Sequence, residues 1–403
     1  MIFSTFLIGE RKYLFLIHGG VTMQITLSAI KADVGSIGGH TRPSEEMLDA
    51  VGMLLQKNID SGLLIDGTVT FTGDDIAIIF SHRHGVNNAK IHVGFAWEAF
   101  LAAAKVAEAQ GNYGAGQDLL VDAPSGNVRG AGPGVAEIEF ELDAKSEYRP
   151  AESFMIFAGD KCAPGAFNLP LYLTFTDPMH NGGLLLNPKM HLGWTITIID
   201  MDHKGEADDR IIRLDVPERS WDVAALLQNP DRYAVESIHS RYKPHEQVVS
   251  VAATRLHNIA GKYTGKDDPI AIIRNQGIFP APEEIIEPYA TVNQIISGDA
   301  RGSHNMPQLP VPVNTAVTGP YCHPIISAIG FSMNHEGKFA ERYVDFFDNQ
   351  AWDYARHLSQ RRAAEIRRQG FFGIAMAQQT EIAYTGLVNT WKQLDDEFEF
   401  RKS

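Results

Sequence analysis

The first regular pattern in the chain is an alternation of polar and apolar residues along 24–30, which is the period of a strand with one buried face. Residues 47–59 then place apolar side chains at helical spacing. Ser44 stands where it can cap the first turn of this helix, and Gly62 stands where the helix can end. The chain is therefore predicted to open with a strand followed by an amphipathic helix.

The same two periods recur along the rest of the sequence. No internal repeat, low-complexity tract or clean linker divides it. This pattern favours an α/β (α+β) fold in which residues 23–403 form one large domain. Further strands are predicted over 63–71, 76–82, 153–158, 191–201 and 269–273, and further helices over 89–110 and 351–369.

Residues 1–22 stand apart from this pattern. They hold two short apolar runs separated by Glu10, Arg11 and Lys12. Neither run is long enough to span a bilayer, and the position of the charges does not suit a signal peptide. We therefore expect an N-terminal extension that is disordered or not native to the protein, with the regular chain beginning at Met23.

Charge and cysteine content narrow the possible functions. The net charge of −14 over 403 residues disfavours nucleic-acid and anionic-membrane partners, which bind basic surfaces. It is compatible with a protein that collects divalent cations. Only two cysteines occur, Cys162 and Cys322, so neither a disulfide framework nor a cysteine zinc site is expected. Cys162 is interpreted as a small packed thiol, and the cytoplasm is the expected compartment.

The segment 261–269 concentrates reactive side chains on one loop. Gly265 allows a tight backbone, and Pro269 disfavours a helix before it. An adjacent pair of aspartates can hold a divalent cation. A lysine beside them can pair with a carboxylate, bind phosphate or form a Schiff base, and a tyrosine can transfer a proton. The alternative is a solvated turn. The side chains concerned are Tyr263, Lys266, Asp267 and Asp268.

Similar polar groups stand in other loops and at other predicted strand ends. Each has an ordinary alternative, such as a capping aspartate, a hairpin turn or an exposed loop histidine. The glycine-rich segment 125–134, with Arg129, could also approach an anion, although it is not a Walker sequence. A third acidic pair, Asp208-Asp209, is interpreted as solvated surface. The candidates for a shared oxygen-rich site, which would favour Mg²⁺ over zinc or copper, are Asp33, His40, Asp74, Asp75, Gln117, Asp160 and Lys161.

These motifs, taken in order, resemble the bifunctional fructose-1,6-bisphosphate aldolase/phosphatase family of archaea and deep-branching bacteria. The resemblance runs from about Met23 to the last helix. It is carried by 30–36 with His40, Gly-Asp-Asp at 73–75, 113–120, 125–130 with 132–137, 160–161 with 164–170, 260–269, 301–304 and Tyr384.

The resemblance implies two reactions in one pocket. Dihydroxyacetone phosphate and glyceraldehyde 3-phosphate would condense to fructose 1,6-bisphosphate, whose C1 phosphate would then be hydrolysed to give fructose 6-phosphate. It also implies several Mg²⁺ ions per subunit, a compact layered α-β-β-α sandwich and a homo-octamer.

The family's residue roles transfer position by position. Lys266 would form the Schiff base, and Tyr263 would move the aldol proton. The implied sugar-phosphate ligands are Tyr113, Gly126, Asn127, Lys161, Gln276, Arg301 and Tyr384. The implied Mg²⁺ ligands are Asp33, His40, Asp74, Asp75, Gln117, Asp160, Asp267 and Asp268.

Three positions depart from the family's pattern, at Gly277, Thr318 and Gly373. All three belong to the substrate and late-loop side, so they affect the expected substrate preference and the balance of the two activities. Two other functions stay open at this point. One is a Mg²⁺-dependent sugar phosphatase without useful aldolase activity, and the other is a non-catalytic protein that binds cations or phosphate.

Overall fold

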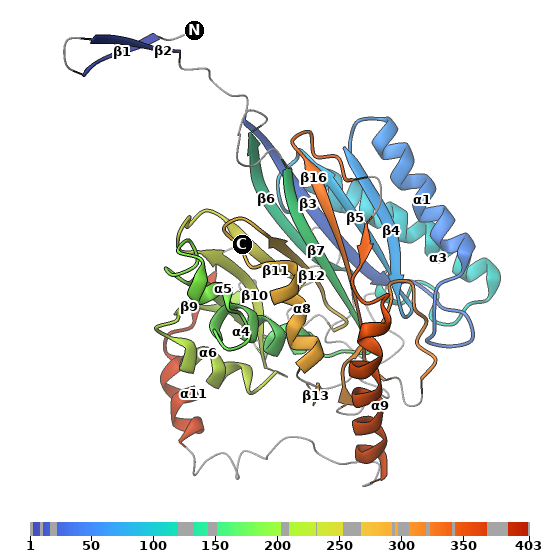
Figure 1. Ribbon diagram of the computed structural model, residues 1–403. Coiled ribbons are helices and arrows are strands. Elements are labelled where there is room, and N and C mark those ends of the chain that lie inside the picture. The colour runs from blue at the N-terminus through green and yellow to red at the C-terminus, as the bar shows by residue number, and fades with distance from the viewer. Residues whose placement is uncertain are drawn as a thin grey trace.

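The computed structural model describes residues 3–8, 11–16, 22–119, 132–143, 151–202, 209–230, 232–252, 267–291, 295–296, 306–319, 323–340, 343–368 and 386–401. Two β-sheets dominate these residues (Figure 1). No helix among them is long and apolar enough to cross a membrane.

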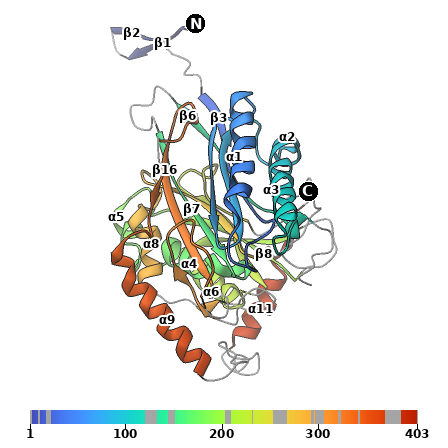
Figure 2. The same ribbon diagram turned by 90° about the vertical axis from the view of Figure 1, so that its right-hand side faces the viewer.

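The smaller sheet has the strand order β4-β5-β3-β6, and all its neighbours are antiparallel. Its strands are β3 (Thr22–Asp33), β4 (Asp66–Thr72), β5 (Asp75–His82) and β6 (Gly134–Asp143). Helix α1 (Glu45–Asp60) and helix α3 (Glu98–Gln110) cover its outer face (Figure 2). Their apolar side chains form one buried cluster with those of β3 and β5.

The larger sheet has ten strands in the order β15-β16-β7-β12-β11-β10-β8-β9-β18, with β17 beside β16. Every pair is antiparallel except β15 and β16. The strands are β7 (Ala151–Asp160), β8 (Trp194–Asp200), β9 (Asp209–Val216), β10 (Tyr233–Ser240), β11 (Gln247–Val251), β12 (Ile270–Asn275), β15 (Leu309–Pro310), β16 (Ile325–Asn334), β17 (Val344–Asp345) and β18 (Glu399–Arg401).

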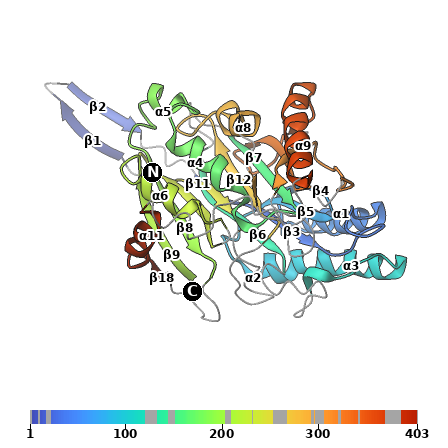
Figure 3. The ribbon, with the colours of Figure 1, turned by 90° about the horizontal axis from the view of Figure 1, so that it is seen from below.

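Helices cover the outer face of the larger sheet as well. Figure 3 shows α4 and α8 on the side of the strands opposite to α1 and α3. Apolar residues of these helices and of the sheet share the largest buried cluster. The elements on this side are η3 (Pro164–Phe167), α4 (Asn168–Thr176), α5 (Gly183–Leu186), α6 (Ser220–Leu227), α8 (Pro282–Thr291), η4 (Gln350–Trp352), α9 (Asp353–Arg368) and α11 (Leu387–Asp395).

The two sheets pack face to face. Alternate residues of β3, among them Ile25, Leu27 and Ala29, meet alternate residues of β7, among them Phe154 and Ile156, in one buried apolar cluster. The layers therefore run helix, sheet, sheet, helix, which is the sandwich that the family resemblance implies.

The helix predicted over 89–110 is present but is not uniform. It begins as α2 (Ala89–Ile91), continues as the π-helical segment η1 (His92–Trp97) and ends as α3. The start of this helix rests on Glu137 of β6. The backbone N–H of Asn87 donates to Glu137 Oε2 at 2.6 Å, and His92 Nε2 lies 3.2 Å from Glu137 Oε1.

A hydrogen-bonded chain extends from Glu137 into the sheet. His84 N–H donates to Nδ1 of His82, so the proton of His82 is on Nε2, which donates to Ser28 Oγ at 2.9 Å. The Ser28 hydroxyl in turn donates to Glu137 Oε1 at 2.6 Å. His82 and Ser28 are fully buried, so this chain holds an uncharged histidine beside a carboxylate.

The N-terminal residues form a hairpin, β1 (Phe3–Ile8) with β2 (Arg11–Leu16), which stands apart from the sheets (Figures 1 and 2). Strand β3 begins at Thr22, one residue before the predicted start of the regular chain. A second short pair joins β13 (Ile295–Ile296) to β14 (Met306–Pro307).

The prediction that Asp209 is solvated surface is wrong. Asp209 opens β9, is buried, and pairs with Arg401 of β18 at 2.6 Å. A charged residue of the last strand, 192 positions away, compensates this carboxylate, and no local pattern could reveal that partner.

Candidate functional site

The candidate site lies where the apolar layer between the sheets ends. Along β3 the inward row of Ile25, Leu27 and Ala29 continues with Lys31 and Asp33. On β5 and β7 the equivalent rows end in Asp75 and Asp160. Asp33 pairs directly with Asp75 in the β3–β5 register, which brings their side chains to the same face. The inward-facing rows of these strands thus change from apolar to acidic residues at the strand ends, and the strand pairing gathers the carboxylates into one cluster.

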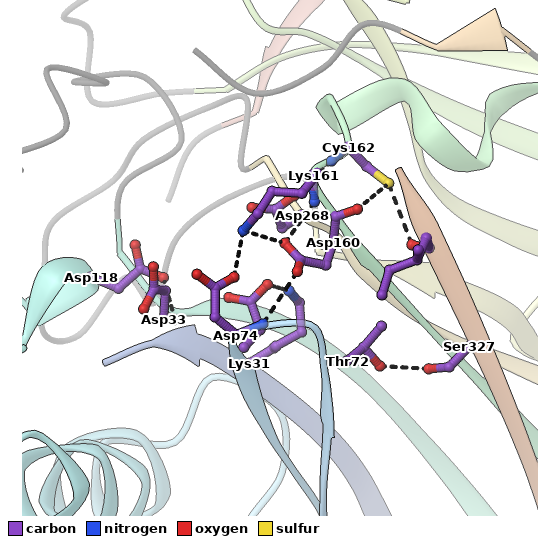
Figure 4. A network of polar contacts seen from close by, with 12 residues as sticks. Lys31, Asp33, Thr72, Asp74, Asp118, Asp160, Lys161, Cys162, Asp268 and Ser327 are labelled. Carbon is purple, nitrogen blue, oxygen red and sulfur yellow. Dashed lines mark hydrogen bonds and ion pairs between the residues drawn. The ribbon is translucent and has the colours of Figure 1, made fainter. Parts of the chain in front are cut away.

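Lys161 lies at the centre of this cluster. Its ammonium group is 2.5 Å from Asp74 Oδ1 and 3.0 Å from Asp160 Oδ1 (Figure 4). The backbone N–H of Asp74 also donates to Asp160 Oδ2 at 3.2 Å. All three residues are buried. The turn between β4 and β5 is therefore tied to the end of β7.

Gly73 is required for this contact. Its φ of +60° lies in the left-handed region, and a Cβ atom there would lie 1.4 Å from Asp160 Oδ2. The carboxylate of Asp160 occupies the space that any side chain at 73 would need.

His40 faces the cluster from the loop after β3. Its Nδ1 lies 3.0 Å from Asp74 Oδ2 and 3.9 Å from Asp33 Oδ2. The ring of Tyr113 packs edge-on against the His40 ring with 4.8 Å between centroids. A glycine-rich loop between Asp33 and His40 lets the histidine turn back onto the strand end, and Tyr113 holds the ring there.

Asp268 enters the site through the backbone of Cys162. Its Oδ1 accepts the Cys162 N–H at 2.7 Å, and its own N–H donates to the Cys162 carbonyl at 2.8 Å. Lys161 and Asp268 both have positive φ, +58° and +50°. Non-glycine residues rarely adopt this conformation, and such strain is concentrated at functional sites. The buried thiol of Cys162 confirms its prediction as a packed residue.

The pKa values of these groups indicate a shortage of positive charge. Burial and then the neighbouring carboxylates raise the pKa of Asp33 well above its usual range. Burial also raises the pKa of Asp160, against the lowering effect of Lys161, and burial with Asp160 raises the pKa of Asp268. Such carboxylates ionise readily only when further cations are supplied.

Asp74 and Lys161 behave as an ion pair within this cluster. Burial alone would raise the pKa of Asp74, but Lys161 and the hydrogen bond from His40 bring it below the ordinary value. Burial alone would lower the pKa of Lys161, but Asp160 and Asp74 raise it. Lys161 therefore favours the ionised form of Asp74, whereas the pKa values of Asp33, Asp160 and Asp268 stay raised.

The donor set suits hard divalent cations. One ligand atom from each of Asp33, His40 and Asp74 lies within 4.8 Å of the others, and so does one from each of Asp74, Asp75 and Asp160. Asp74 belongs to both groups, so two ions could share it. Carboxylate oxygens with a single imidazole match the ligands of Mg²⁺ and Mn²⁺ better than those of zinc or copper.

Two residues that lie in this site, Lys31 and Asp118, were not assigned from the sequence. Lys31 contacts Asp75 Oδ2 directly. Asp118 Oδ2 accepts the backbone N–H of Asp33 at 2.9 Å, and Asp118 Oδ1 accepts that of Gly132 at 3.1 Å. The available signals were the position of Lys31 two residues before Asp33 on the same strand face, and that of Asp118 next to Gln117.

The remaining predicted residues are placed less centrally or not at all. Gln117 begins the short helix η2 (Gln117–Leu119), and Asp267 adjoins Asp268. Asp268 stands just before β12, and Gln276 directly follows its other end. At about 3.3 Å per residue, the two residues are about 25 Å apart along the strand. The structure does not bring Gln276 to the cluster of its own chain. The predictions that lie outside the described residues are Tyr263, Lys266, Gly126, Asn127, Arg301 and Tyr384.

Comparison with known proteins agrees with this geometry. The family described as Fructose-1,6-bisphosphatase matches residues 24–399. The chain is 47% identical to the fructose-1,6-bisphosphate aldolase/phosphatase of Thermus thermophilus over 93% of this chain and 100% of the relative. It is 44% identical to the protein of that name from Cenarchaeum symbiosum, over 90% and 91% of the two chains. For the one from Ignicoccus hospitalis the identity is 41%, over 94% of each chain.

Proposed function

Because this chain belongs to the fructose-1,6-bisphosphate aldolase/phosphatase family, we propose that it makes fructose 1,6-bisphosphate from two triose phosphates and then releases its C1 phosphate. The substrates are dihydroxyacetone phosphate and glyceraldehyde 3-phosphate, and the final products are fructose 6-phosphate and phosphate. The observation that carries the phosphatase step is the buried carboxylate cluster around Lys161. Such a cluster needs divalent cations and can hold a phosphorylated ligand between them and the ammonium group.

We assign the first step to Lys266 and Tyr263. The amine of Lys266 would form a Schiff base with the carbonyl of dihydroxyacetone phosphate, and Tyr263 would transfer the proton of the aldol step. Lys266 directly precedes Asp267, and Tyr263 stands three residues before Lys266, so the same segment brings aldolase and phosphatase groups together. Tyr113, Gly126, Asn127, Arg301 and Tyr384 complete the proposed sugar-phosphate contacts.

The proposed cofactor is Mg²⁺, several ions per subunit. Its ligands would be Asp33, His40, Asp74, Asp75, Gln117, Asp160, Asp267 and Asp268. When bound, Mg²⁺ polarises the phosphoryl group and lowers the pKa of the attacking water. Within the chain, Lys161 can exchange its contacts with Asp74 and Asp160 for a phosphate oxygen as the ions neutralise those carboxylates.

Chelation and one substitution test the metal site. We expect EDTA to abolish phosphate release by the wild type, and Asp74→Ala to abolish it in excess Mg²⁺, because Asp74 belongs to both ligand groups. The matched control is Asp49→Ala on the outer part of α1. Full turnover in metal-free buffer would exclude a metal-dependent phosphatase.

The decisive test of the aldolase step is Lys266→Arg. The guanidinium stays protonated and cannot form an imine, so condensation should fall to background while phosphate release falls much less. Tyr263→Phe should separate the activities in the same direction. Borohydride reduction with dihydroxyacetone phosphate, followed by mass mapping, should locate the adduct on Lys266. An intact condensation rate in Lys266→Arg, or no trapped adduct in the wild type, would leave a Mg²⁺-dependent phosphatase as the function.

The departures at Gly277, Thr318 and Gly373 bear on the balance of the two reactions. These three positions do not belong to the carboxylate cluster. We therefore expect the rate of phosphate release to resemble that of the relatives, and the rate of condensation to differ more from theirs. Rate measurements for both steps on one preparation would check this expectation.

We also propose that the protein is a homo-octamer in which subunits complete one another's sites. The support is Gln276, which the family resemblance makes a substrate ligand but which lies at the far end of β12 from the cluster of its own chain. A neighbouring subunit would receive this side chain.

Mixed oligomers can test this arrangement. Gln276→Ala and Asp74→Ala subunits, each inactive alone, should recover part of the phosphatase activity when they are unfolded together and reassembled. Light scattering should give eight subunits for the wild type. A monomer, or no recovery in the mixture, would contradict the proposal.

A cytoplasmic location remains part of the proposal. It is supported by the low cysteine content of the sequence, in which Cys162 and Cys322 are the two cysteines.

A further inference from the structure

Lys31 is a deeply buried charge of the carboxylate cluster. It is 1% exposed and lies on β3, one inward-facing position deeper than Asp33. Its ammonium group contacts Asp75 Oδ2, and Asp75 is equally buried. The residue before it in the inward row is Ala29, which belongs to the apolar layer between the sheets. Lys31 therefore forms the boundary between core and site.

The backbone of Lys31 cannot move without breaking the smaller sheet. Lys31 pairs with Ala77 of β5 on one side and with Gly134 of β6 on the other. Lys161, by contrast, stands just beyond the end of β7. The two buried ammonium groups therefore differ: Lys31 lies inside a strand that is paired on both sides, whereas Lys161 follows a strand end.

The charges around Lys31 show why a fixed cation matters. Among the described residues the cluster buries the carboxylates of Asp33, Asp74, Asp75, Asp118 and Asp160, and Asp268 is half-buried beside them. Lys31 and Lys161 are the buried ammonium groups that face them. Carboxyl groups therefore outnumber ammonium groups in the cluster, and removing Lys31 would take away the ammonium group that contacts Asp75.

We propose that Lys31 is a positioning residue that serves as a permanent cation at the floor of the metal site. It fixes the carboxylate of Asp75 through Oδ2 and lets the metal-free cluster remain folded. The positive charge of Lys31 also repels the nearest divalent ion. Lys31 therefore lowers the affinity for metal while it stabilises the metal-free fold. The inference rests on the proposed function only in taking the cluster as a divalent-cation site.

The experiment compares thermal unfolding with and without metal. In EDTA, Lys31→Met should lower the unfolding midpoint by several degrees relative to the wild type. At a Mg²⁺ concentration 10-fold above the one that saturates the wild type, this difference between the two midpoints should shrink by at least half. The double variant Lys31→Met with Asp75→Asn removes both members of the pair and should recover the midpoint in EDTA, because no buried carboxylate is left without its partner. Lys392→Met, on exposed α11, is the matched control and should change neither value.

Metal titration gives a second readout. Calorimetry with Mn²⁺ should show at least fivefold tighter binding to Lys31→Met than to the wild type, because the repulsion between Lys31 and the ion is gone. Equal loss of stability with and without metal, no recovery in the double variant, or weaker Mn²⁺ binding would each overturn the proposal and leave Lys31 as a packing residue. A wild type that lacks both proposed reactions but shows this pattern would reject the proposed function and keep the role of Lys31.

Discussion

At the scale of single residues, Gly73 is a tightly constrained position of the candidate site. Gly73→Ala would place a methyl group against Asp160 Oδ2, so Asp160 must leave Asp74 and Lys161. We expect a loss of stability of about 3 kcal/mol and Mg²⁺ binding at least 100-fold weaker. Chemical denaturation and calorimetry would measure the two effects.

Gly62→Ala is the matched control for this prediction. Gly62 has a φ of +77°, and a Cβ atom there meets nothing within 4 Å. It should incur only the backbone cost of about 1–2 kcal/mol, with metal binding unchanged. If the two variants behave alike, the contact with Asp160 is not what fixes Gly73.

The buried His82 predicts sensitivity to acid. Burial lowers the pKa of His82 from its ordinary 6.5 to about 4. Between these pH values the unfolded chain binds a proton that the folded chain does not, so stability present above pH 6.5 is lost as the pH falls toward 4. The loss is at most about 3 kcal/mol for this group.

Unfolding midpoints measured from pH 7 to pH 4 would test the acid sensitivity. His82→Gln should give a shallower decline than the wild type, because glutamine does not titrate, whereas the exposed His357→Gln should leave the decline unchanged. Identical slopes in all three proteins would show that His82 does not control acid stability.

The sequence predicted much of the candidate site because its residues stand in short motifs. Asp33 and Asp160 end β3 and β7, Asp75 begins β5, and Asp74 directly precedes it. The two sheets bring these strand ends together. Lys31 was missed because a lysine inside an alternating strand pattern has the same local signature as a surface residue. The face of β3 that carries Lys31 is buried because the larger sheet packs on it, and the strands of that sheet lie more than a hundred residues further along the chain.

At the scale of elements, α1 shows a cap that the sequence predicted correctly. Ser44 Oγ accepts the backbone N–H of Met47 at 3.3 Å, and Glu45 and Glu46 occupy the first turn. Ser44→Ala should reduce the free energy of unfolding by about 1 kcal/mol, because a helix N–H loses its acceptor in a buried position. Urea denaturation would measure this, with Ser61→Ala at the exposed C-terminal end as the control; a larger loss at Ser61 would contradict the assignment of the cap.

Elements with a clear sequence period were predicted better than elements without one. Helix α1 places its buried residues at helical spacing, and β4 alternates threonine with apolar residues. Strand β16 is buried along most of its length, so its residues show no period, and it was not predicted. The π-helical turn at 92–97 was also missed, because the distant Glu137 beneath His92 is not part of the local pattern.

At the scale of the whole molecule, the hairpin of β1 and β2 is predicted to be dispensable. It pairs with itself, and the sheet begins at Thr22. A chain that starts at Met23 should keep its unfolding midpoint within about 2 °C, its assembly state and both activities. Size-exclusion chromatography, calorimetry and rate measurements would check this; aggregation of the shortened chain would show that the hairpin has a structural role.

The placement of the carboxylate cluster at the edge of the layer between the sheets also sets an order of events during folding. Asp33 and Asp75 come together as soon as β3 pairs with β5, a contact between nearby parts of the chain. Asp160 and Asp268 arrive only when β7 and β12 have paired and the two sheets have closed on each other. Contacts between distant segments form slowly, since a long stretch of chain must lose its freedom first. A newly synthesised chain would thus acquire helices and hairpins well before it could retain an ion, and ion uptake would mark the last stage of its maturation.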